Sequence, residues 1–224
     1  MRYVEAAARG AIGCALLAGL VGCAAVSEPF NAIQQSLATP AGTAPTGTAA
    51  APKEAPVAPT TQRAFDDAAR ALRAGRVDEA ERGFRALAQA NPELGGPHAN
   101  LGVIHARAGR LSEAAAEFEQ ATRLGPQQPI YFNQLGVSYR QLGRFDKARE
   151  AYERAIALDP NYAAPCLNLA ILNDLYLNDG ARALELYDRY LALSPDGDAT
   201  VAKWVADLKN RKPTTVAANR KEKA

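Results

Sequence analysis

A short pattern recurs in this chain at a spacing of 34 residues. Each copy reads Gly, Arg, an apolar residue, two polar residues and Ala, and the copies begin at Gly75, Gly109 and Gly143. A looser fourth copy ends at Ala183. The prolines that follow the copies lie 34, 34 and 35 residues apart, at Pro92, Pro126, Pro160 and Pro195. A fixed period of this length indicates stacked, similar units rather than one globular core.

Each unit carries the apolar spacing of two helices. In the second half of a unit, an aromatic residue follows a small residue by four positions, which places both on one helical face. These pairs are Ala80 and Phe84, Ala114 and Phe118, Ala148 and Tyr152, and Ala183 and Tyr187. Ala151 lies off this stripe, so we expect it to tolerate a larger side chain. The Gly of each turn is suited to end the first helix in a left-handed conformation, and the Pro stops the second.

The first half of a unit has its own stripe, which in the third unit is Phe132, Leu135, Gly136 and Tyr139. On these residues the chain resembles the tetratricopeptide repeat family over residues 61–208. The resemblance implies an all-α fold, a right-handed superhelical α-solenoid of four helix pairs. Their predicted ranges are residues 61–94, 95–128, 129–162 and 163–197.

Two further segments flank the repeats on the carboxyl side. Val201, Trp204, Val205 and Leu208 continue the first-helix stripe, so residues 198–211 are predicted to form a capping helix with Trp204 in its core. Residues 212–224 are rich in Lys and Arg and are predicted to be a disordered tail.

The amino terminus has the features of an export signal. Arg2 and Arg9 precede an apolar stretch, residues 11–21, that is too short to span a bilayer. It ends in Leu-Val-Gly-Cys at residues 20–23, which resembles the lipobox of bacterial lipoproteins. The alternative is an ordinary signal peptide that is cleaved a residue or two later.

The lipobox resemblance implies that residues 1–22 are removed and that Cys23 is acylated. Ala24, rather than Asp, follows the cysteine, and this implies sorting to the outer membrane with the repeats facing the periplasm. Residues 23–60 then form a disordered tether, since residues 39–61 are almost entirely Ala, Pro, Thr and Gly. Cys166, on the stripe of the fourth unit, would be a lone thiol and is predicted to be buried.

The chain contains few groups that could carry chemistry. His98 and His105 share a helical face, but no third ligand is spaced for zinc, and we assign them to packing. No nucleophile stands beside a base and no Gly-rich loop opens a helix after a strand, so we expect no enzyme and no cofactor. A net charge of +2 gives no case for nucleic acid.

In the tetratricopeptide family, the first helices line a concave groove that holds peptides. The resemblance places ten residues of this chain there: Arg73, Asn100, Val103, Arg107, Asn133, Gln134, Val137, Gln141, Asn168 and Ile171. Asn100, Gln134 and Asn168 recur once per unit, and their amides suit a peptide backbone. The alternative is that these amides bond only neighbouring helices. The arginines suit an acidic group, whereas the carboxyl-terminal end of the groove is apolar.

These features predict a membrane-anchored scaffold that binds a peptide or partner protein. Repeat lipoproteins of this kind resemble the pilotins of type IV pili, the Tad-pilus assembly lipoproteins and adaptors of energy-transducing complexes. The predicted partner is therefore a protein of the cell envelope, in a pilus, secretion or energy-transducing machine. The alternative is a structural module that associates with itself and takes no extended peptide.

Overall fold

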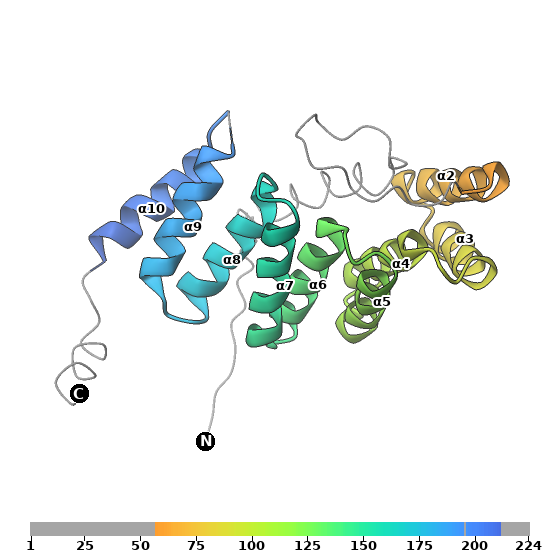
Figure 1. Ribbon diagram of the computed structural model, residues 1–224, viewed down its shortest axis with the longest axis horizontal. Helices are drawn as coiled ribbons and strands as arrows, with labels where there is room; N and C mark the ends of the chain where they lie inside the picture. The colour runs from red at the N-terminus through yellow and green to blue at the C-terminus, as the bar shows by residue number, and fades with distance from the viewer. Residues whose placement is uncertain (1–56, 195, 212–224) are drawn as a thin grey trace, which may run out of the picture.

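The computed structural model describes residues 57–194 and 196–211. Over these residues the chain is nine α-helices and no strand (Figure 1). The helices are α2 (Pro59–Arg73), α3 (Val77–Ala90), α4 (Gly95–Arg107), α5 (Leu111–Leu124), α6 (Pro129–Gln141), α7 (Phe145–Leu158), α8 (Ala163–Leu175), α9 (Gly180–Ala192) and α10 (Ala199–Asn210). The predicted signal sequence, Cys23, most of the tether and the basic tail lie outside the described residues.

The helices form four consecutive pairs and one additional helix, which confirms the predicted solenoid. Figure 1 shows the pairs following one another in chain order along the long axis, from α2 at one end to α10 at the other. Each helix packs against its partner in the pair and against the next helix in the chain. None of the helices in the described part of the chain is long and apolar enough to cross a bilayer.

The turns within the first three pairs use the predicted glycines. Gly75, Gly109 and Gly143 have φ angles of +76°, +74° and +72°, a region that side chains rarely adopt. The fourth turn is one residue longer, and Asn178 takes the left-handed position with φ of 54°. Asn is the residue that most often replaces Gly in this conformation, because its side chain bonds locally. The next residue, Asp179, caps α9 by accepting from the backbone N–H of Arg182 at 3.0 Å.

The small and aromatic residues of the second helices form the core, as predicted. The four alanines of this column are fully buried, and so are the four aromatic rings within a few per cent. The close approach is tightest between α6 and α7, where a Cβ built on Gly136 would lie 2.5 Å from Cε1 of Tyr152. Cys166 is also fully buried, which confirms its predicted place.

Two packing predictions are wrong. Ala151 is buried, because the face of α7 that meets α6 is wider than the stripe of Ala148 and Tyr152. Trp204 is 38% exposed rather than part of the core, although its ring lies 6.1 Å from that of Tyr187. In the earlier pairs the first helix is covered by a second helix of its own, and no described helix follows α10. Trp204 therefore faces a side that is left open.

Candidate peptide-binding surface

The exposed sides of α2, α4, α6 and α8 form a surface that we call the first-helix face. The ten predicted groove residues lie on these four helices. They divide into a buried middle and exposed ends. Asn100, Val103, Asn133 and Gln134 are buried, Val137, Asn168 and Ile171 are half-buried, and Arg73, Arg107 and Gln141 are exposed.

Three of the amide side chains have partners within the fold. Asn100 Nδ2 donates to the carbonyl oxygen of Gly96, one turn earlier in α4, at 2.9 Å. Asn168 Nδ2 donates to Asn133 Oδ1 at 3.0 Å and thereby joins α8 to α6. Asn133 Nδ2 in turn donates to the hydroxyl of Tyr162 at 3.3 Å. These bonds are of the intramolecular kind that the sequence left open as the alternative to peptide contact.

Tyr162 is a member of this chain of bonds that sequence reasoning missed. Burial raises the pKa of its phenol to about 12, so the hydroxyl stays protonated and neutral. It lies just before α8, outside the positions that the repeat pattern assigns to the first-helix face. Only an aromatic residue recurring before a first helix could have signalled it, and the other units have Leu94 and Gln128 there.

Gln134 differs from the other amides. It is 2% exposed, and its Nε2 has no hydrogen-bond partner among the described residues. Its neighbours one turn away on α6, Ile130 and Val137, are partly exposed, so the amide lies just beneath an accessible surface. A buried donor without an acceptor costs about 1–3 kcal/mol. The middle of the first-helix face thus holds an unmet donor.

The carboxyl-terminal end of the first-helix face is apolar, as predicted. Leu167 and Ile171 are half-buried on α8, and Leu175 at its end is 66% exposed. Tyr176, which follows, is 45% exposed and its ring lies 4.8 Å from that of Phe145. This end therefore offers contact area for apolar side chains of a ligand.

Sequence reasoning also missed two charged residues on this face. Arg140 of α6 is half-buried; burial lowers its pKa, but the nearby hydroxyls of Tyr152 and Tyr176 outweigh this and raise it, so the guanidinium is charged. Asp174 of α8 accepts from Arg211 at 2.8 Å, and only 6% of its side chain is exposed. Both fall at the second-to-last position of a first helix, where a per-unit comparison of charges would have found them.

The histidines take part in packing between paired helices. His98 Nδ1 lies 2.7 Å from Glu117 Oε2 of α5. His105 is 5% exposed, with Nδ1 at 3.8 Å from Glu113 Oε2. No group of three metal-ligating side chains gathers within residues 57–194 and 196–211.

Comparisons with known proteins place the repeats in a family. Tetratricopeptide repeat models match residues 65–129 and residues 129–162. No curated protein matches the chain. Among solved structures, a double mutant of MamA RS-1 resembles it with a TM-score of 0.61 and 18% identity, over 69% of this chain and 85% of that one.

Two more solved structures are similar. PilF of Pseudomonas aeruginosa has a TM-score of 0.60 and 21% identity, over 66% of this chain and 67% of that one. A tetratricopeptide repeat protein of Parabacteroides merdae has a TM-score of 0.58 and 20% identity, over 67% of this chain and 59% of that one. Identities this low show a common fold and nothing finer.

Proposed function

Because this chain belongs to the tetratricopeptide repeat family, we propose that it is a scaffold that holds an extended segment of a partner protein on its first-helix face. The fold itself is that of a protein–protein interaction scaffold. The site and the ligand are the finer part of the proposal.

The unmet amide of Gln134 is the observation that carries this proposal. An extended segment presents a backbone carbonyl every residue, and one such acceptor would satisfy Nε2. The donor costs about 1–3 kcal/mol while it is buried without a partner, so a ligand that supplies the acceptor recovers part of this energy. Val137 and Ile171, half-buried on either side, would contact the alternate side chains of the same segment.

The cellular setting of the proposal rests on the amino-terminal sequence. The lipobox at residues 20–23 supports acylation of Cys23, and Ala24 supports an outer-membrane location. A scaffold anchored there by several acyl chains would stay on the membrane. Its partner would then be a periplasmic segment of an envelope machine such as a pilus, secretion or energy-transducing complex.

Photo-crosslinking combined with one conservative substitution tests the site. Gln134→Met keeps the side-chain length but removes the unmet donor, so we expect a slightly higher unfolding midpoint and roughly tenfold weaker partner binding, about 1.4 kcal/mol. Gln89→Met, at an exposed position of α3, should change neither. A photoreactive residue at Val137 should crosslink the partner in whole cells, and one at exposed Ala116 should not.

Two results would contradict this proposal. One is unchanged partner binding by Gln134→Met. The other is a crosslink from Val137 that joins only a second copy of the chain, which would instead support the self-associating module.

Labelling with a clickable fatty acid tests the anchor. Wild-type protein should take up the label, and Cys23→Ser should not, because only a thiol at this position accepts the acyl chain. Cys166→Ser is the matched control and should label normally, since Cys166 is fully buried within the repeats. Equal labelling of wild type and Cys23→Ser would end the lipoprotein proposal and leave the repeat scaffold untouched.

A further inference from the structure

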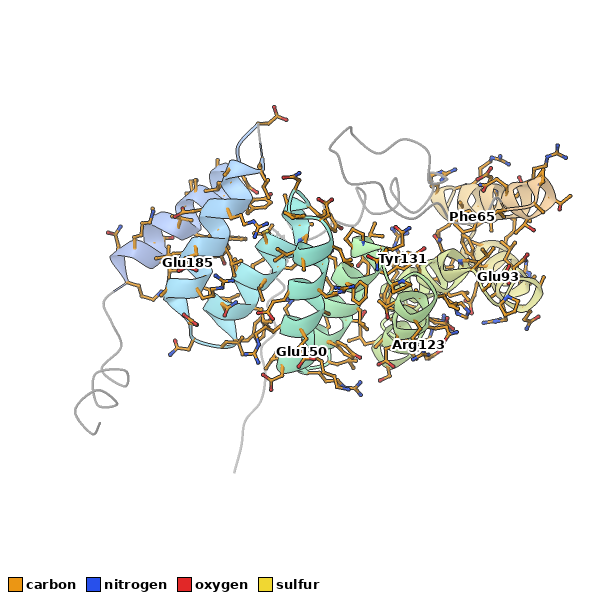
Figure 2. The ribbon with its side chains drawn as sticks, in the orientation of Figure 1. Phe65, Glu93, Arg123, Tyr131, Glu150 and Glu185 are labelled. Carbon is orange, nitrogen blue, oxygen red and sulfur yellow. The ribbon has the colours of Figure 1, made fainter. Side chains whose placement is uncertain are left out.

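A cavity lies between α6 and α7, away from the first-helix face. Its floor is Phe132, Leu135 and Tyr139 of α6, and its wall is Lys147, Ala151 and Arg154 of α7, with Glu150 at the rim. The cavity volume is about 280 Å³. Figure 2 labels Glu150, which marks the side of α7 concerned.

The other repeat units fill the equivalent space. In the second unit, Glu117 stands where α7 has Ala151, and its carboxylate reaches His98 at 2.7 Å. In the fourth unit the position is Leu186, which is 3% exposed. In the first unit it is Gly83, where α3 and α2 approach so closely that a Cβ would lie 2.9 Å from Ala68 Cβ. The third unit alone among these four has a small side chain and an open space.

The charges around the cavity are also reversed relative to the second unit. There, Glu113 and Glu117 on the second helix face two histidines on the first. In the third unit the rings of Tyr139 and Phe132 replace the histidines, and Lys147 stands in the place of Glu113. An acidic group that pairs with the first helix in one unit is thus missing from the next.

Two cations lie over the aromatic floor without an acidic partner. Lys147 Nζ is 5.5 Å from the ring centroid of Tyr139, and Arg154 Cζ is 5.8 Å from that of Phe132. Neither forms an ion pair with any carboxylate that the structure describes. The Tyr139 hydroxyl donates to Glu119 of α5 at 2.7 Å, which holds that ring in place. Glu150 is the one acidic side chain in the lining, so positive charge is in excess.

We propose that this cavity binds an acidic segment of a partner protein, which inserts a glutamate where the second unit has Glu117. The methylene groups of the glutamate would lie on the rings of Phe132 and Tyr139, and its carboxylate would pair with Lys147 and Arg154. An apolar floor with cations at its edge fits this side chain better than it fits a basic or a purely apolar one. The scaffold would then have a second docking surface, independent of the first-helix face.

The test is a titration of the full chain with a short oligo-L-glutamate peptide, followed by backbone amide chemical shifts. We expect shifts at the residues of α6 and α7 that line the cavity. Ala151→Glu supplies the missing acid from the chain itself, so it should weaken the peptide at least roughly tenfold. Ala157→Glu adds the same charge at an exposed position of α7 and should leave the affinity unchanged. If Ala151→Glu does not fold, the double variant Lys147→Gln and Arg154→Gln replaces it, with the same expected loss.

Three outcomes would overturn the proposal. Equal affinity of wild type and the cavity variants would show that the peptide binds elsewhere. Shifts confined to the Lys- and Arg-rich residues after α10 would show nonspecific attraction to that segment. The same α6 and α7 shifts on concentrating the chain without peptide would show that a second copy occupies the cavity.

Discussion

Single glycines decide how closely the paired helices approach. Gly136 stands in a helix interior, where Ala is intrinsically preferred by up to about 1 kcal/mol. The buried ring of Tyr152 occupies the space that a methyl group would need, at 2.5 Å from the ideal Cβ position. Ala170 takes the same column in the fourth unit, so the demand for Gly is set by the local distance between α6 and α7 rather than by the repeat as such.

We therefore expect Gly136→Ala to destabilise the chain, against helix propensity. Overpacking costs about 1–3 kcal/mol, which exceeds the gain from the better helix former. Chemical denaturation measures the change. A double-mutant cycle supplies the control: in a Tyr152→Leu background the same substitution should cost much less, because the obstructing ring is gone. Equal costs in both backgrounds would mean that the clash is not the cause.

Predictability at the residue scale follows from what each prediction depended on. The buried alanines and rings of the second helices were predictable, because they face their partner within one unit. The environments of Ala151, Trp204 and Asn133 were not, because each depends on a helix that precedes or follows in the array. The burial of Asn133, for example, follows from the arrival of Tyr162 and Asn168 from the next unit.

Neighbouring helix pairs are joined by a small number of polar contacts in addition to the core. Glu81 of α3 accepts from Arg85 at 2.6 Å and from Arg110, in the α4–α5 turn, at 3.3 Å. Partial burial raises the pKa of Glu81, but the two guanidinium groups outweigh this and the net shift is downward. The contact joins the first unit to the second, and helices were predictable here while this link was not, since nothing in the 34-residue pattern pairs residues 29 apart.

Glu81→Gln should lower the free energy of unfolding at neutral pH by about 0.5–1 kcal/mol. The folded-state pKa is below the ordinary value of 4.5, so the ionised group stabilises the fold above that value and loses its effect as the pH falls through the folded-state pKa. The gap between wild type and variant should therefore close in acid. Urea denaturation at several pH values measures it, and Glu79→Gln, in an exposed pair within one unit, should show a smaller gap. A gap that persists in acid would rule out the ionic contact as its source.

At the scale of the whole molecule, a linear array lacks the long-range contacts that would make it fold as one unit. Each helix touches its neighbours in the chain, so the stability of one end depends weakly on the other. The carboxyl-terminal end is held by α10 and by Arg211, whose guanidinium lies 2.8 Å from Asp174. Asp174 and burial together raise the pKa of the Tyr187 phenol, so this carboxylate depends on Arg211 for its charge partner.

Arg211→Gln should loosen this end alone. It leaves the carboxylate of Asp174, with 6% of its side chain exposed, without a cation, which is costly for a nearly buried charge. Hydrogen exchange should become several-fold faster in α8, α9 and α10 and stay unchanged in α2 to α5. Lys209→Gln, which removes an exposed cation 3.9 Å from Asp188, is the matched control and should have little effect. Uniformly faster exchange from α2 to α10 would instead mean that the array opens as one cooperative unit, and the independence of its two ends, on which separate docking surfaces depend, would be lost.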